Sequence, residues 1–215
     1  MKIEIWSDIM CPFCYIGKRH FEKALSQLEH TDTIEIEWKS FQLDPTIPKK
    51  VEKISVYQYL ADAKGISFSE SKEMHDNVVQ SAKNVGLTYN YDNAIIANSF
   101  DAHRMIQFAK SQGLGNQLEE ALFKAYFTDG KNIGDINDLL NIGVSIGLNK
   151  IELKAVLESE KFTNEVNTDI SEAQEIGVRG VPFFVFDRKY AISGAQPISV
   201  FIETLETVLK ESKTS

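Results

Sequence analysis

Two cysteines separated by two residues are the side chains of this sequence best suited to chemistry. Cys11 and Cys14 are the only cysteines among 215 residues, and they stand in the motif Cys11-Pro12-Phe13-Cys14. A thiolate is both the nucleophile of disulfide exchange and a metal ligand, so the pair predicts redox chemistry or metal binding. The alternative is that both cysteines are ordinary buried residues with no chemical role.

The surrounding pattern predicts that the motif lies where a strand gives way to a helix. Residues 2–7 alternate apolar and polar side chains, and an apolar stripe recurs from Pro12 to about Leu28. Proline is well suited to the first helical position, which makes Cys11 the N-cap. We expect the Cys11 sulfur to accept hydrogen bonds from the amides of Phe13 and Cys14, and the helix dipole to stabilise its thiolate.

The helix position divides the roles of the two cysteines. Cys14 lies one turn further into the predicted helix and is expected to be less exposed than Cys11. We therefore predict that Cys11 attacks a disulfide and that Cys14 resolves the mixed disulfide. A zinc site would require two further ligands, and none of the histidines has ligand-like spacing, so no metal is predicted (His20, His30, His75 and His103).

The remaining pattern predicts an α/β protein with a helical insertion. A second strand is expected at 34–41, strands at 183–186 and 189–193, a helix from about 162 to 176, and a last helix from Pro197. Between them lie helices at about 55–64, 69–85, 97–112, 116–128, 135–146 and 149–159. This order predicts a discontinuous domain of residues 1–48 and 161–215, with 49–160 as an inserted helical subdomain. Glu35, Glu37 and Lys39 are expected to face solvent.

Charge and hydropathy exclude several classes of partner. The net charge of −8 and the pI near 5.1 oppose attraction to nucleic acid or to anionic lipid. The first residues carry acids where a signal peptide would be uninterruptedly apolar, and no segment approaches transmembrane length. We therefore expect a cytoplasmic protein that binds neither nucleic acid nor membrane.

A proline far from the cysteines precedes one predicted strand. Gly180-Val181-Pro182 leads into the apolar run 183–186. Only about 5–6% of X–Pro bonds in folded proteins are cis, so the residues alone predict a trans Pro182 that opens the strand.

Several segments together resemble the FrnE-like branch of the DsbA family of thioredoxin-like disulfide oxidoreductases. The likeness runs from residue 1 to about 209 and is carried by Asp8-Ile9-Met10-Cys11-Pro12-Phe13-Cys14-Tyr15-Ile16-Gly17-Lys18-Arg19, Ser40-Phe41-Gln42-Leu43-Asp44-Pro45, Asn98-Ser99-Phe100-Asp101-Ala102-His103-Arg104, Gly177-Val178-Arg179-Gly180-Val181-Pro182-Phe183-Phe184-Val185 and Gly194-Ala195-Gln196-Pro197. The resemblance implies a thioredoxin-like fold with a large inserted all-helical subdomain, and disulfide oxidoreductase activity.

The resemblance also extends the expected site. It implies a cis Val181–Pro182 bond beside Cys11, where the backbone of Val181 would pair with an extended substrate strand. It implies a helical subdomain over the dithiol, where His103 and Asn98 could contact substrate together with Phe13. From the residues alone, a partly buried core position is favoured for His103, and Asn98 either caps its helix or contacts substrate.

One departure from the family pattern bears on the direction of electron flow. Phe13 stands where this branch often has tryptophan and where periplasmic relatives have histidine, and a phenyl ring cannot stabilise a thiolate by charge. A reducing or isomerising role is therefore expected. The implied partners are a protein or small molecule that contains a disulfide or thiol, and a thiol recycling system. No bound cofactor is expected beyond the redox-active Cys11–Cys14 disulfide, and glutathione is a candidate co-substrate.

Two other functions remain open at the level of the sequence. The 2-hydroxychromene-2-carboxylate isomerases and kappa glutathione transferases resemble this fold and its insertion, which makes a glutathione-dependent isomerase or transferase the second interpretation. Those enzymes typically carry serine in place of the first cysteine, so the retained pair favours dithiol chemistry. A non-enzymatic peptide-binding or chaperone module, with an apolar groove beside Phe13 and Val181, is the third interpretation.

Overall fold

The computed structural model describes residues 1–28, 34–49, 51 and 54–212. The chain divides into two compact units, one made of Met1–Leu43 and Asn167–Ser215 and the other of Asp44–Val166. We call them the sheet unit and the helical unit. Among the histidines considered as zinc ligands, His30 lies outside the described residues.

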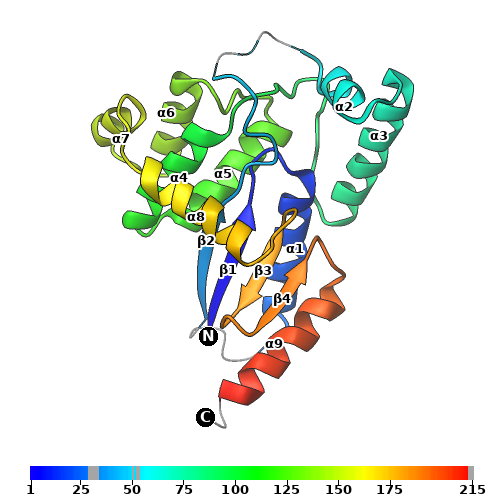
Figure 1. The fold of residues 1–215 in the computed structure, drawn as a ribbon, viewed down its shortest axis with the longest axis vertical. Helices are drawn as coiled ribbons and strands as arrows, with labels where there is room; N and C mark the ends of the chain where they lie inside the picture. The colour runs from blue at the N-terminus through cyan, green and yellow to red at the C-terminus, as the bar shows by residue number, and fades with distance from the viewer. Residues whose placement is uncertain (29–33, 50, 52–53, 213–215) are drawn as a thin grey trace. The chain divides into compact units, whose positions relative to one another are not determined.

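The sheet unit is built on four strands in the order β2-β1-β3-β4 (Figure 1). The strands are β1 (Lys2–Ser7), β2 (Glu35–Ser40), β3 (Phe183–Phe186) and β4 (Tyr190–Ser193). β1 pairs in parallel with β2, whereas β1–β3 and β3–β4 are antiparallel. The first strand of the chain is therefore central, and it is hydrogen-bonded to strands from both ends of the sequence.

One face of this sheet forms an aromatic core with two helices, α1 (Pro12–Leu25) and α9 (Ile198–Ser212). Ile3 and Ile5 on β1 lie opposite Phe186 and Phe184 on β3, and all four are fully buried. The Phe184 ring lies 5.5 Å from that of Phe21 in α1 and 4.8 Å from that of Phe201 in α9. These contacts attach the helix that begins at the cysteines to the sheet.

The opposite face of the sheet packs against α8 (Thr163–Glu175), a helix that contains the boundary between the two units. The buried cluster on this face consists of Trp6 on β1, Ala173 on α8, Val178 and Val185. Phe41, Val181 and Phe183 are partly buried against this cluster. The residue before Pro182 is thereby attached to the face of the sheet that α8 covers.

The helical unit contains the helices between β2 and α8. They are α2 (Val56–Lys64), α3 (Phe68–Asn84), α4 (Phe100–Ser111), α5 (Gly115–Phe127), α6 (Ile136–Ser145) and α7 (Lys150–Leu157). The first two pack against each other, and α4 packs against α5 and α7 (Figure 1). Asp135 accepts hydrogen bonds from the amides of Asn137 and Asp138, which makes it the N-cap of α6.

The predicted fold class, an α/β sheet domain with an inserted helical part, is confirmed. Two predicted helices are too long. α1 ends at Leu25 rather than near Leu28, because Ser26 at its C-cap starts a turn. α4 begins at Phe100 rather than near residue 97, because the Asn98 side chain accepts the hydrogen bond of the Phe100 amide before the helix starts.

Candidate active site

Cys11 lies at the point where the loop after β1 becomes α1. Its amide donates to the Asp8 carbonyl at 2.9 Å, and its φ of −84° and ψ of 111° are those of an N-cap residue. Pro12 is the first helical residue, where its missing N–H breaks no helical hydrogen bond. The predicted position of the Cys-Pro-Phe-Cys motif at a strand-to-helix junction is confirmed.

The hydrogen bonding of the Cys11 sulfur differs from the prediction. The side chain of Cys11 makes no capping hydrogen bond with the amides of α1. Instead the thiol donates to the backbone carbonyl of Val181, with 3.4 Å between Sγ and O. The expected bonds from the Phe13 and Cys14 amides are wrong for this state, because the protonated thiol donates its hydrogen to the Val181 carbonyl oxygen, and an N–H group cannot accept it.

The peptide bond between Val181 and Pro182 is cis. The trans bond predicted from base rates is therefore wrong, whereas the cis bond is the one that the family resemblance implies. The Pro182 carbonyl accepts from the Gly194 amide at 2.8 Å, which joins the proline to the end of β4. Pro182 also packs against Gly17 of α1. Segments from both ends of the chain thus meet at the Cys11 sulfur.

Cys14 has the environment of a thiol that stays protonated. Both cysteines are almost fully buried, so exposure does not separate them. Burial raises the pKa of Cys14 well above its ordinary value, and the hydrogen bond and charge of Cys11 raise it further. Hydrogen bonds from the Asp8 amide and the Ser7 hydroxyl act in the opposite direction but are the smaller effects. Cys14 therefore lies beside Cys11 as a neutral thiol.

Asp8 holds the loop that carries the cysteines. Its side chain is almost fully buried, and its carboxylate accepts from the Leu43 amide at 2.7 Å and from the Met10 amide at 3.3 Å. One carboxylate therefore connects the β1–α1 loop to the segment that follows β2. These contacts make Asp8 a structural residue of the turn before Cys11.

Phe13 and Val181 are the two predicted substrate contacts that belong to the sheet unit. The side chain of Phe13 is 46% exposed, directly beside two buried cysteines. Val181 is partly buried, and its carbonyl already contacts Cys11. A large apolar side chain exposed beside a reactive sulfur is suited to contact an apolar group of a substrate.

His103 and Asn98, the other two predicted substrate contacts, belong to the helical unit. Asn98 accepts from the Phe100 amide at 2.9 Å and donates to the Ile47 carbonyl at 2.5 Å, so its side chain caps α4. His103 is 1% exposed and lies on the buried face of α4. The capping interpretation of Asn98 is the one that these contacts bear out, and a substrate role for either residue stays a prediction.

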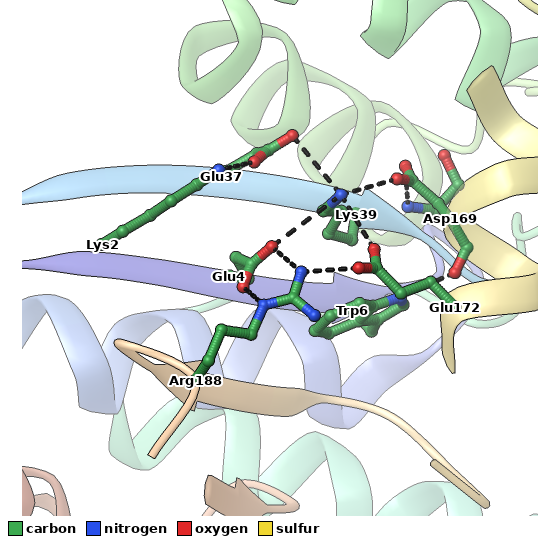
Figure 2. A network of polar contacts seen from close by, with 9 residues as sticks. Lys2, Glu4, Trp6, Glu37, Lys39, Asp169, Glu172 and Arg188 are labelled. Atoms are coloured by element: carbon green, nitrogen blue, oxygen red, sulfur yellow. Dashed lines mark hydrogen bonds and ion pairs between the residues drawn. The ribbon is translucent and has the colours of Figure 1, made fainter. Parts of the chain in front are cut away.

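A polar network on the face of the sheet that α8 covers was not predicted (Figure 2). The Lys39 ammonium lies 3.1 Å from carboxylates of both Asp169 and Glu172 on α8. Arg188, in the turn between β3 and β4, pairs with Glu172 and with Glu4, whose side chain is buried. The solvent-facing position predicted for Lys39 is wrong, because α8 covers this face and leaves only 12% of its side chain exposed.

A signal for this network was present in the sequence. Glu4 and Trp6 alternate with Ile3 and Ile5 along β1 and therefore share its other face, and the parallel register sets Lys39 of β2 opposite Trp6. Asp169, Glu172 and Ala173 have helical spacing and therefore share one face of α8. The sequence pattern does not show that α8 packs on this face of the sheet, and the network depends on that packing.

The described residues contain neither a cluster of metal-binding side chains nor a membrane-spanning helix. No three His, Cys, Asp or Glu side chains there gather into a group that could hold a metal ion. No helix in the described part of the chain is long and apolar enough to cross a membrane.

Relatives of this chain cover it from end to end. The protein YwbO of Bacillus subtilis strain 168 is 26% identical over 211 residues, which is 97% of this chain and 98% of YwbO. The crystal structure of a probable DsbA oxidoreductase from Streptomyces coelicolor matches with a TM-score of 0.93 and 38% identity, over 98% of this chain and 91% of that one.

More distant structures share the fold. The cytosolic disulfide reductase DsbM of Pseudomonas aeruginosa matches with a TM-score of 0.69 at 15% identity, over 98% of this chain and 99% of that one. A 2-hydroxychromene-2-carboxylate isomerase matches with a TM-score of 0.71 at 13% identity, over all of this chain and 98% of the isomerase. The model of the DsbA-like thioredoxin domain matches residues 2–206. With its dithiol at the start of α1, its central β1 and its inserted helices, the chain belongs to the DsbA-like thioredoxin domain family.

Proposed function

We propose that this protein is a thiol–disulfide oxidoreductase of the FrnE type, which reduces or isomerises disulfides with Cys11 as the attacking thiolate and Cys14 as the resolving thiol. Membership of an oxidoreductase family gives the general class. The observation that carries the specific roles is the contact between the Cys11 sulfur, at the N-cap of α1, and the carbonyl of Val181.

The proposed reaction is an exchange of disulfides in two steps. The Cys11 thiolate attacks one sulfur of the substrate disulfide, which breaks the S–S bond, forms a mixed disulfide and releases the first substrate thiolate. Cys14 then loses its proton and attacks the Cys11 sulfur, which forms the Cys11–Cys14 disulfide and releases the second substrate thiolate. Each thiolate released takes up a proton, so the substrate gains two electrons and two protons from the dithiol.

Two features of the sheet unit support these roles. The amide end of α1 favours negative charge on a sulfur at its N-cap, which suits Cys11 for the attack. Burial keeps Cys14 protonated, so that the substrate disulfide meets one nucleophile rather than two. In isomerisation, the substrate thiolate released in the first step attacks a different disulfide of the substrate and frees another thiolate there. That thiolate attacks the substrate sulfur of the mixed disulfide, which breaks the bond to Cys11 and releases it as a thiolate without oxidation of the pair.

The direction of electron flow follows from the residues between the cysteines. Pro12 and Phe13 bring neither positive charge nor a side-chain hydrogen-bond donor to the thiolate, so the reduced form gains no stabilisation from them. A less stable thiolate makes the dithiol a better reductant. We therefore propose a reductase or isomerase that acts on protein or small-molecule disulfides in the cytoplasm.

A thiol must return the pair to the dithiol form after each reduction. DsbM has been solved with glutathione, and glutathione is accordingly the first recycling thiol to test here. A glutathione-dependent isomerase or transferase remains the second candidate, because 2-hydroxychromene-2-carboxylate isomerase shares the fold. Two cysteines exceed what that chemistry needs, which is why the oxidoreductase is proposed first.

Reduction of insulin tests this proposal. The reduced wild-type protein should accelerate the cleavage of insulin disulfides by glutathione or dithiothreitol, and Cys11→Ser should abolish the acceleration. Cys14→Ser should accumulate a mixed disulfide at Cys11, which mass spectrometry of acid-quenched samples detects. Circular dichroism is the control for folding of both variants. Unchanged turnover by Cys11→Ser would contradict the proposed roles.

A further inference from the structure

One residue of α8 is bonded to both of the adjacent strands β1 and β2. The carboxylate of Asp169 accepts from the Ser40 amide at the end of β2 at 2.9 Å and lies 3.1 Å from the Lys39 ammonium. Its backbone carbonyl accepts from the Trp6 indole N–H on β1 at 2.8 Å. Asp169 is 4% exposed and Trp6 is fully buried. Figure 2 shows the indole of Trp6 and the carboxylates of α8 meeting over the two strands.

Charges extend this contact over the Trp6 ring. The Lys39 ammonium lies 5.9 Å from the ring centroid, and the Arg188 guanidinium lies 5.8 Å from it. Two cations near one buried indole hold the ring in place through its π-face while its N–H holds α8. The position of α8 on the sheet is therefore set by directional contacts in addition to apolar packing.

The segment after α8 leads directly to Val181. α8 ends at Glu175, and Gly177 takes a φ of 80°, which lets the Val178 amide bond back to the Ala173 carbonyl at 2.8 Å. Val178 joins the buried cluster around Trp6, and Val181 packs against the same cluster. The segment from Gly177 to Val181 is thereby fixed at both ends. Near Gly177 it is hydrogen-bonded to α8, and at Val181 it packs against the cluster that contains Trp6.

We propose that Trp6 and Asp169 are positioning residues for Val181, which set its backbone groups where an extended peptide substrate can pair with them. The inference rests on the proposed disulfide exchange and adds to it a preference for peptide disulfides. A peptide strand gains two hydrogen bonds only if the N–H and C=O of Val181 are correctly placed, because hydrogen bonds weaken steeply with misalignment. A disulfide without a peptide backbone has nothing to pair with Val181.

The test compares two disulfides and two variants. Trp6→Phe keeps an aromatic ring but removes the N–H, and Asp169→Asn keeps an acceptor for the Ser40 amide but removes the charge beside Lys39. Each reduced protein is mixed with excess cyclic peptide disulfide, or with bis(2-hydroxyethyl) disulfide, and acid-quenched samples give the loss of dithiol with time. The dependence on concentration gives a saturating rate and a half-saturation concentration.

Two matched controls separate positioning from general stability. Glu172→Gln lies one turn from Asp169 and also loses an ion pair with Lys39, but the Glu172 side chain is 26% exposed against 6% for Asp169, so solvent screens its charge. Within the described part of the chain, Glu172 also makes no hydrogen bond to the backbone of a strand. Val208→Ala removes buried volume from α9 on the other face of the sheet. Both controls should leave the half-saturation concentration for the peptide within about twofold of wild type.

The expected result is a selective loss of peptide binding. Trp6→Phe and Asp169→Asn should raise the half-saturation concentration for the peptide about 5- to 10-fold, because loss of a buried hydrogen bond or charge is worth about this factor. The saturating rate, its pH profile between about 6 and 9, and the reaction with bis(2-hydroxyethyl) disulfide should stay within about twofold. Hydrogen exchange of residues 177–181 should become faster in both variants, whether or not a substrate is present.

Several outcomes would overturn the positioning role. They are an equal loss with both disulfides, the same loss in Val208→Ala, or an unchanged peptide half-saturation together with unchanged hydrogen exchange. A shifted pH profile would also overturn it, because that would mean that the residues act on the thiols. A wild-type protein that reacts with neither disulfide contradicts the proposed function instead, and the hydrogen-exchange comparison then still decides whether Trp6 and Asp169 hold the Val181 segment.

Discussion

Gly17 and Pro182 are in such close contact that no side chain fits between them. A Cβ atom built on Gly17 would lie 2.9 Å from the Pro182 Cγ and 3.5 Å from Ala195. This glycine is on α1, on the turn that follows Cys14, so it lets the helix of the dithiol approach the proline that follows Val181. Glycine is needed at this position because it has no side chain.

Gly17→Ala should therefore disturb the site more than it disturbs the helix. Alanine is the better helix former, but the overlap with Pro182 should cost about 1–3 kcal/mol of the free energy of unfolding. Urea unfolding measures this loss, and insulin reduction should fall with it. Gly180→Ala is the matched control, because its added Cβ meets no atom within 4 Å and its φ is not left-handed. Equal stability of Gly17→Ala and wild type would show that the proline moves freely.

The raised pKa of Cys14 gives a spectroscopic prediction. In Cys11→Ser the contribution of the first cysteine is lost, but burial, the largest cause, remains. The thiolate absorbance near 240 nm should therefore not appear until the pH exceeds 9.0, the ordinary value for this thiol. Cys14→Ser, titrated in parallel, reports Cys11 alone. Thiolate absorbance of Cys11→Ser that develops below pH 9.0 would be incompatible with a buried neutral Cys14.

The ion pairs of Glu172 give a prediction for acid stability. Burial acts to raise the pKa of Glu172, but hydrogen bonds from Arg188 and Lys39 outweigh it, so the pKa lies below its ordinary value of 4.5. A depressed folded-state pKa adds stability that is complete above the unfolded pKa and is lost as the pH falls through the folded pKa. Because Arg188 is half exposed, we expect Glu172→Gln to cost only about 0.5 kcal/mol.

The difference in unfolding free energy between wild type and Glu172→Gln should thus be constant from pH 7 to about pH 5 and should shrink below 4.5. Urea unfolding at a series of pH values measures it. A difference that grows as the pH falls would have the wrong sign for this pair.

Arg104 gives a prediction for the helical unit. Its guanidinium is buried and donates to the carbonyls of Val156, Ser159 and Lys161, and it pairs with Asp101 at 2.8 Å. These bonds satisfy carbonyls at the end of α7, so Arg104→Met should cost about 3–5 kcal/mol. Arg104→Lys keeps the charge but not the planar set of donors and should recover only part of this loss. Thermal and urea unfolding rank the three proteins, and a Met variant as stable as wild type would refute the role.

The elements of the fold could be predicted because their signals are local. The alternation of residues 2–7, the proline after Cys11 and the apolar run 183–186 each specify a strand or a helix end within a few residues. These signals were enough to place Cys11 at the N-cap of α1. They contain no information on which carbonyl the sulfur would meet.

What could not be predicted depends on contacts between distant segments. The cis Pro182 packs against Gly17 of α1, and this contact does not follow from the residues around the proline. The alternating pattern of β2 predicts that Lys39 is exposed, but α8 packs over it and leaves its side chain mostly buried. Gly17 and the residues of α8 lie more than a hundred residues from Pro182 and Lys39 respectively, beyond the reach of periodicity.

The pairing of β1 with β3 has a consequence for how this protein is made. A chain synthesised from its N-terminus presents the two thiols with its first strand, whereas Val181, which lies 170 residues after Cys11, is added near the end. At ordinary rates of translation this interval is roughly 10–30 s. Throughout it the dithiol has neither its carbonyl partner nor the strand that completes its sheet. The nascent protein therefore carries an unshielded pair of thiols, and shielding them is among the last events of its folding.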